Sequence, residues 1–154
     1  MKKLVSVLVF VGLIFITSMA QAAGSCVLTS TENVTIQNQT HRKYITLTCT
    51  GDGSIGAYSF VPSTTGVKGW YLYNITTDPG ASAPTADYDI TLMVDGEDIA
   101  GGLLANRSTS ATQTVVLAPT TLGYHMADGT MLITFANQTA NPSTIVMTLR
   151  FTTN

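Results

Sequence analysis

Apolar and polar residues alternate with a period of two along much of the chain, which indicates half-buried β-strands. In Ile145–Phe151, every second residue is a large apolar one, and Lys43–Cys49 follows the same rule with threonine between its apolar residues. No window after residue 22 shows the apolar spacing of an amphipathic helix. Strands are predicted at Asn33–Asn38, Lys43–Cys49, Tyr58–Val61, Trp70–Thr76, Tyr88–Val94, Glu97–Ile99, Thr112–Leu117, Thr130–Ala136 and Ile145–Phe151.

Turn residues separate these strands at intervals of roughly 8–15 residues, which favours an all-β fold. Asp95-Gly96 is a tight-turn pair, and the prolines in Thr77–Ala86 predict a long loop there. The sequence does not decide which residues of Trp70–Thr76 point inward, because either the even or the odd positions can face a core. We therefore predict one antiparallel β-sandwich, jelly-roll or Ig-like, of about eight or nine strands.

The N-terminus has the features of a secretory signal peptide, which predicts a signal helix over residues 1–22 and a mature domain over 23–154. Lys2 and Lys3 precede an apolar run, and Ala20-Gln21-Ala22 supplies a small-x-small cleavage site. A membrane anchor needs a run of roughly 20 apolar residues, and a lipoprotein would carry its lipid on Cys26. Export with cleavage fits best, so we expect no stable membrane span and a periplasmic, extracellular, cell-surface or virion-surface location in a bacterial or phage system.

Charge excludes one class of partner. Once Lys2 and Lys3 are removed, five basic residues remain against nine acidic ones. A chain this poor in lysine and arginine has no electrostatic footprint for nucleic acid. Its polar surface must come largely from threonine, serine and asparagine, as in an exported β-protein.

Cys26 and Cys49 are the two cysteines of the chain. In an exported protein an even pair predicts a disulfide, here closing a loop of about two dozen residues. A metal site or a catalytic thiol would need neighbouring ligands or a base, and neither cysteine has one nearby in the sequence.

Acidic residues gather in the predicted loops and turns, where carboxylates can serve as calcium ligands. The EF-hand spacing is absent, and Asp95-Gly96 is equally the turn of a hairpin, so no metal is assigned and calcium stays an alternative. The candidate ligand-binding residues of these loops are Asp78, Asp87, Asp89, Asp95, Glu97 and Asp98.

Aromatic residues on neighbouring predicted strands offer a surface for stacking on surface glycans, although such residues more often belong to a core. The candidate aromatic face comprises Trp70, Tyr71, Tyr73 and Tyr88. Enzymatic motifs are absent, and the two histidines, His41 and His125, lie in unlike contexts, so we predict that the protein is not an enzyme.

The segment Gly69–Leu117 resembles a β-rich domain of uncharacterised bacteriophage structural proteins, and the match covers about fifty residues in order. The matching pieces are Gly69-Trp70, Thr77-Asp78-Pro79-Gly80, Pro84-Thr85, Tyr88-Asp89-Ile90-Thr91-Leu92, Asp95-Gly96-Glu97-Asp98, Gly101-Gly102 and Ala105-Asn106-Arg107. This resemblance implies a capsid-decoration or tail-associated role with other protein subunits, including homo-oligomers, as partners. A signal peptide is unusual for virion proteins, so a surface adhesin or carbohydrate-binding sandwich and a strand-exchanging pilin-like subunit remain alternatives.

Overall fold

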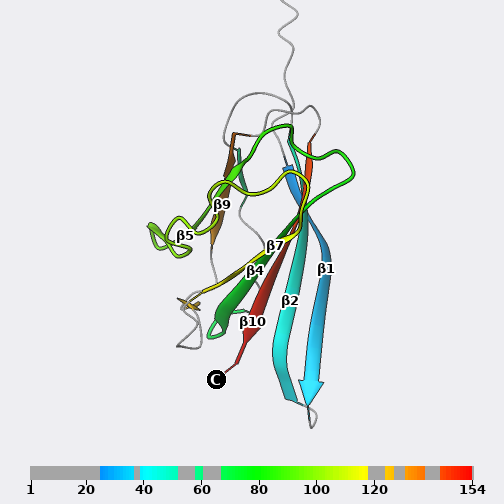
Figure 1. Cartoon of the computed structure of the whole chain (residues 1–154). Coiled ribbons are helices and arrows are strands. Elements are labelled where there is room, and N and C mark those ends of the chain that lie inside the picture. The colour runs from blue at the N-terminus through cyan, green and yellow to red at the C-terminus, as the bar shows by residue number, and fades with distance from the viewer. Residues whose placement is uncertain are drawn as a thin grey trace, which may run out of the picture.

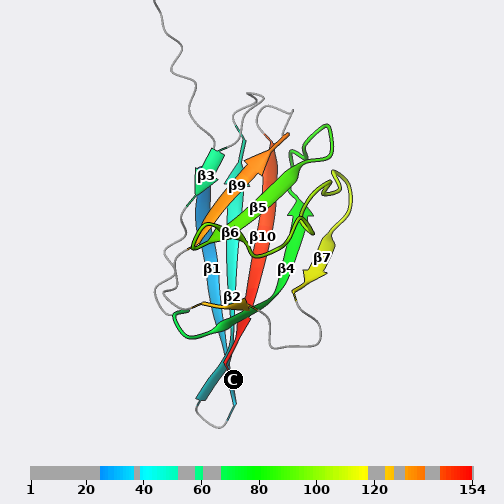
Figure 2. The same cartoon turned by 90° about the vertical axis from the view of Figure 1, so that its left-hand side faces the viewer.

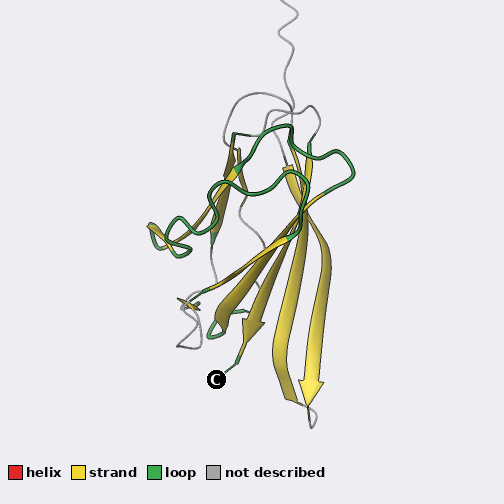
Figure 3. Ribbon diagram, in the orientation of Figure 1, coloured by secondary structure: helices red, strands yellow, loops and turns green. Residues whose placement is uncertain are grey.

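The protein is an all-β sandwich of two antiparallel sheets in a computed structural model (Figure 1). The structure describes residues 25–36, 39–51, 58–60, 67–117, 124–126, 131–137 and 143–153. These ranges contain no helix (Figure 3), and in particular none long and apolar enough to cross a membrane. The predicted signal peptide over residues 1–22 lies outside the described residues.

Sheet A is the larger layer, and β8 (Tyr124–His125) pairs with its strand β4. Its other strands, in spatial order, are β1 (Ser25–Ile36), β2 (Gln39–Thr50), β10 (Thr144–Thr152), β4 (Tyr71–Pro79) and β7 (Gln113–Val116). Sheet B consists, in order, of β3 (Tyr58–Phe60), β9 (Leu132–Ala136), β5 (Asp89–Val94) and β6 (Glu97–Asp98). Figure 2 shows sheet B in front of sheet A, whose strands β1 and β2 run well past those of sheet B.

The core lies between the two sheets and is built by the alternation seen in the sequence. Residues at every second position of β10 and of β5 are buried, while their neighbours are half-exposed. Removing this much apolar surface from water is the main term that stabilises the sandwich. Fully buried side chains from both layers include Leu47, Leu72, Ile75, Leu92, Ile133, Phe135, Ile145, Met147, Leu149 and Phe151.

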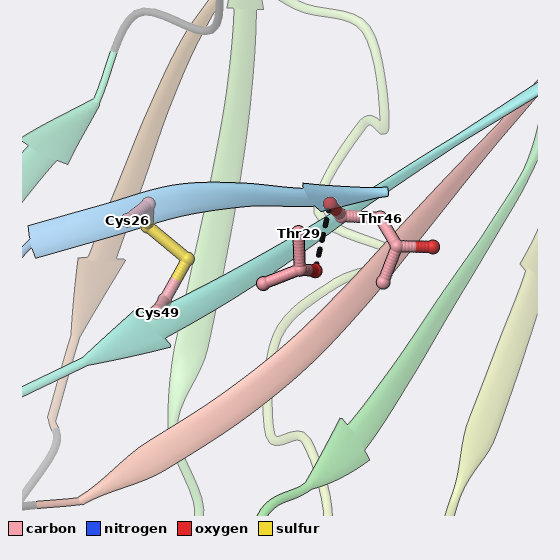
Figure 4. Close-up of a disulfide and its surroundings, with 4 residues drawn as sticks. All are labelled: Cys26, Thr29, Thr46 and Cys49. Carbon is pink, nitrogen blue, oxygen red and sulfur yellow. Dashed lines mark hydrogen bonds between the residues drawn. A yellow bond between two sulfur atoms is a disulfide. The ribbon is translucent and has the colours of Figure 1, made fainter. Parts of the chain in front are cut away.

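One long strand, β1, replaces the shorter strand predicted at Asn33–Asn38. The pairing with β2 shifts register between Leu28 and Ser30, so Thr29 is accommodated in a β-bulge. The Thr29 hydroxyl donates a hydrogen bond to the carbonyl of Thr46 at 3.1 Å (Figure 4). The bulge breaks the period of two, and β1 lies at an exposed edge, so its alternation is weak although the strand is continuous.

The prediction of a loop from Thr77 onwards was wrong, because β4 continues to Pro79. Gly80 donates its N–H to the carbonyl of Thr144 on β10 at 2.8 Å. Backbone groups of a strand point alternately to its two sides, so the proline nitrogen faces away from β10. On that side the pairing with β7 stops at Thr77, which lies opposite Gln113, the first residue of β7. A proline at the end of a strand therefore removes no ladder hydrogen bond here.

A second bulge settles the inward set of β4, which the sequence left open. The pairing with β10 shifts register where Arg150 opposes Asn74 and Phe151 opposes Leu72. Leu72 and Ile75 are both fully buried, so even positions face the core before the bulge and odd positions after it. Both interpretations of the sequence were therefore half right.

The predicted disulfide between Cys26 and Cys49 is present (Figure 4). The two residues oppose each other directly across β1 and β2, with 3.9 Å between their Cα atoms. Both side chains are buried on the core side of sheet A. The bond therefore joins the edge strand to the interior of the sheet.

Candidate functional site

The candidate acidic residues form hairpin and loop contacts rather than one cluster. Asp95 and Gly96 adopt positive φ angles of 52° and 86° and join β5 to β6 as a two-residue turn, as predicted. The carboxylate of Asp98 accepts N–H groups from Ala100 at 3.1 Å and Gly102 at 2.9 Å. Asp98 thus fixes the start of the irregular segment that follows β6.

Asp89 has a similar role at the start of β5. Its carboxylate accepts the N–H of Asn106 at 2.8 Å and the side-chain amide of Asn137 at 2.5 Å. Asp78 and Asp87 are exposed in other parts of the chain, at the end of β4 and before β5. Among the described residues, no group of three or more Asp, Glu, His or Cys side chains is placed to hold a metal ion. Calcium binding stays a prediction that has no assembled ligand set in these ranges.

Replacing Asp98 with alanine is expected to lower the free energy of unfolding by about 1–3 kcal/mol, because two backbone N–H groups lose a charged acceptor. The matched control is Glu97→Ala, since Glu97 is the exposed neighbour on the same strand. Urea unfolding with and without about 1 mM calcium, the range of weak extracellular calcium sites, measures both effects. A destabilisation by Asp98→Ala that appears only with calcium present would reverse this assignment in favour of a metal ligand.

The candidate aromatic face is divided between the two sides of sheet A. Tyr88 is fully buried and cannot stack on a ligand at the surface. Trp70 packs against the core, with the Lys43 ammonium 5.1 Å from the centre of its ring. Tyr71 and Tyr73 are half-exposed. Because Leu72 points inward and the bulge follows it, these two tyrosines lie on the outer face.

A cluster of basic and aromatic side chains occupies this outer face, and we call it the basic–aromatic patch. It is assembled from four neighbouring strands of sheet A: β2, β10, β4 and β8. One row across the sheet pairs Arg42 with Thr152, Thr152 with Tyr71, and Tyr71 with His125. The patch comprises Arg42, Tyr44, Tyr71, Tyr73, His125 and Arg150.

Arg150 lies at the centre of the patch and is held in place by neutral partners. Its Nη1 donates hydrogen bonds to Asn74 and Thr76 on β4. Its guanidinium carbon lies 5.7 Å from the centre of the Tyr44 ring, a cation–π distance. The cation is therefore preorganised on the sheet, and these contacts leave its charge uncompensated.

Tyr73 and Tyr44 interact within the same patch. Burial is the main cause that raises the pKa of the Tyr73 phenol, and the neighbouring Tyr44 raises it further. Arg42 and Arg150 act in the opposite direction through their positive charge. Tyr73 therefore remains a neutral hydrogen-bonding group at physiological pH, within range of both arginines.

Four residues of the patch, Arg42, Tyr44, His125 and Arg150, were not predicted from the sequence as site residues. The positions of Arg42, Tyr44 and Arg150 alternate with the inward residues of Lys43–Cys49 and Ile145–Phe151, which does place them on the outer face. What the sequence could not supply is that β2 and β10 are neighbours, with Tyr44 opposite Arg150. Strand order, rather than any local motif, creates this patch.

A second polar cluster is buried and connects Tyr88, Thr77 and Arg107 of the segment Gly69–Leu117. Tyr88 and Arg107 form an isolated β-bridge, in which the Arg107 N–H donates to the Tyr88 carbonyl at 2.7 Å. The Arg107 side chain is only 5% exposed, and its Nε donates to Thr77 Oγ1 at 2.9 Å. Burial lowers the pKa of Arg107 and raises that of Tyr88. These motif residues hold the segment after β6 onto the sandwich, so they shape the fold.

The two histidines make different contacts at one end of sheet A. The His41 carbonyl accepts the N–H of Thr153 at 3.1 Å and the hydroxyl of Thr152 at 3.2 Å. The His125 ring lies 4.9 Å from that of Tyr71, centre to centre. In the described residues, both histidines therefore lie near the C-terminal end of β10, where they contact neighbouring strands of sheet A.

Comparison of the chain with protein-family models, with curated proteins and with solved structures finds no match.

Proposed function

We propose that this protein is an exported, non-enzymatic structural module that assembles with other protein subunits through the free edge of β1. Its role would be of the kind that capsid-decoration and tail-associated proteins have on a phage particle. The observation that carries the proposal is the length of this edge, since β1 is a strand of 12 residues at the end of sheet A. The Cys26–Cys49 disulfide is compatible with an oxidising, extracytoplasmic location.

The β1 edge differs from the other strand edges of the sandwich. Strands β7, β3 and β6 have 4, 3 and 2 residues, respectively, which is too short to template another strand. β1 contains no proline and one charged residue, Glu32. The side chains of Val27 and Leu28 are 60% and 48% exposed, which is unusual for large apolar residues on a strand at the solvent-facing edge of a sheet. β1 is thus long, free of proline and sparsely charged, and its two bulges are the main feature that would oppose strand addition.

The backbone groups available on this edge follow from the alternation of hydrogen bonds in sheet A. Gly51 at the end of β2 bonds to Ser143, so odd positions of β2 face β10 and even positions face β1. Thr46 opposes Ser30 and Tyr44 opposes Glu32. The backbone groups of Thr31, between them, therefore point to the free edge.

The last strand of the chain, β10, is hydrogen-bonded on both sides, to β2 and to β4. The edge that can accept another subunit is therefore β1 rather than the alternating terminal strand. The occupant we propose is the β1 strand of a second copy of this chain. Two such strands pair antiparallel about a two-fold axis and extend sheet A across both molecules.

Proline at Thr31 is expected to abolish self-association while the sandwich stays folded, because it blocks an N–H that no β1–β2 bond uses. The matched control is Thr114→Pro on β7, where alternation also turns the N–H to a free edge, since Val115 opposes Ile75. Sedimentation velocity from micromolar to millimolar concentration measures the assembly state, and circular dichroism verifies the fold. A wild-type protein that stays monomeric throughout, or a Thr31→Pro variant that associates like wild type, would overturn the proposal.

Export has its own test, which does not depend on assembly. Mass spectrometry of the protein recovered outside the cytoplasm should show a chain that begins at Ala23 and has lost two hydrogens through the Cys26–Cys49 bond. A chain retained with residues 1–22 in the membrane fraction would contradict the exported module.

A further inference from the structure

The basic–aromatic patch has the chemistry of a binding site, and we propose that it binds a saccharide that carries a carboxylate. The ligand class is an acidic glycan, such as a polymer of hexuronic acid. The site is independent of the β1 edge, because it lies on the outer face of sheet A over β2, β10, β4 and β8. It would give the module a way to attach to a surface as well as to other subunits.

Two arginines of the chain come together at this place. Five basic residues follow the predicted cleavage site, against nine acidic ones in the chain. Arg42 and Arg150 lie on the outer face of the adjacent strands β2 and β10, with Tyr44 directly opposite Arg150. Two of the five cations thus lie together on the outer face of a chain that is acidic overall, which creates a local attraction for anions.

The guanidinium groups suit a carboxylate. Arg150 is fixed by its hydrogen bonds from Nη1 to Asn74 and Thr76, and it stacks on Tyr44. Arg42 is exposed on the neighbouring strand β2, two positions before Tyr44. A planar guanidinium binds a carboxylate through two parallel hydrogen bonds, and the entropy cost is smaller when the cation is already fixed.

The tyrosines and neutral polar groups suit the rest of a sugar. Tyr71 and Tyr73 are half-exposed on this face, and Tyr73 lies beside Tyr44, so the rings offer apolar surface and the hydroxyls offer hydrogen bonds. Thr152 and Asn74 add further neutral donors and acceptors in the same rows. Nucleic acid is disfavoured, because two cations are few for a phosphate backbone.

The binding test uses the full mature protein in affinity gels cast with polygalacturonate, at about 0.15 M salt to screen weak surface attraction. Fully methyl-esterified polygalacturonate has the same sugar backbone without the carboxylate charge and is the matched ligand control. We expect retardation by the acidic polymer and none by the ester. Equal retardation by both, or by neither, would overturn the proposal.

The variant test compares two exposed cations. Arg42→Gln removes one charge from the patch, and Lys68→Gln removes one charge from the turn before β4. Arg42→Gln should weaken binding by about tenfold, the effect of one lost charge-assisted hydrogen bond, whereas Lys68→Gln should change it less than about twofold. Equal weakening would mean that binding follows net charge alone, and the site would be rejected.

Two further arms distinguish a saccharide site from general attraction of anions and from a site for acidic peptides. Tyr44→Leu removes the stacking ring without changing charge and should also weaken the retardation, while the oligomeric state remains that of wild type. Polyglutamate is the competitor for an acidic-peptide site. If polyglutamate displaces the protein from the gel as effectively as soluble polygalacturonate does, the proposed ligand class is wrong. If polyglutamate does not displace the protein, the saccharide assignment is supported.

Discussion

Replacing Ile133 with alanine should lower the free energy of unfolding by about 2–5 kcal/mol. Ile133 lies in β9, is fully buried, and opposes Leu92 on one side and Phe60 on the other. Its truncation leaves a cavity between two sheets that are held together by this core, and neighbouring strands relax into it only partly. A single domain has a total stability of about 5–15 kcal/mol, so the variant loses a large part of it. Denaturant unfolding followed by circular dichroism measures the change.

Leu132 supplies the control at the adjacent position. Its side chain is an isomer of isoleucine, and it is 38% exposed because it points away from the core. Leu132→Ala removes the same atoms and should cost less than about 1 kcal/mol, as surface substitutions usually do. Equal costs at both positions would mean that β9 does not present its odd residues to the core. A strand shifted by one residue exchanges its two faces, so this pair of variants tests the register of sheet B.

The alternation of apolar residues was sufficient to predict the fold class and most of the strands. Where both neighbours of a strand are present and one face is buried, as in Ile145–Phe151, the period of two is forced by the geometry of the strand. The Asp95-Gly96 turn followed from similarly local chemistry, so the strands and this turn depend on one segment at a time. The Cys26–Cys49 bond joins two strands and was predicted from the even pair of cysteines.

Features that depend on the partner of a strand were beyond the sequence. The bulge that redirects β4 arises because Arg150 and Phe151 of β10 oppose Asn74 and Leu72 across an extra residue. That bulge decides which tyrosines reach the outer face, and it separates Tyr73 from the core-packed Trp70. Likewise, Pro79 is tolerated in a strand because β7 begins only at Gln113, opposite Thr77, and leaves no partner for Pro79 on that side. The sequence therefore identified only some of the candidate binding residues, because the order in which the strands pair determines which side chains lie next to one another.

Removal of the disulfide by a Cys26→Ala, Cys49→Ala double substitution should lower the free energy of unfolding by about 3 kcal/mol. The two cysteines are 23 residues apart, so the bond restricts the unfolded chain over the whole β1–β2 hairpin. The native effect is local, because among the described strands β1 pairs with β2 only, and the bond joins the two at the N-terminal end of β1. Amide exchange should therefore become fastest at Ser25–Leu28 in the double variant, with the core strands protected longer.

Reductant provides the internal control for this last prediction. Wild-type protein that is unfolded and refolded in dithiothreitol should have the same denaturant midpoint of unfolding as the double variant, apart from the small effect of the two missing sulfur atoms. The midpoint of the double variant itself should not change with reductant. Both sulfur-bearing side chains are buried, so reduction of the native protein without denaturant should be slow and limited by opening of the edge. If wild type has the same midpoint with and without dithiothreitol after passing through the unfolded state, the bond does not contribute to stability. The double variant can also be tested for self-association. If it associates like wild type, the hydrogen bonds to β2 are sufficient to keep the β1 edge in register without the disulfide.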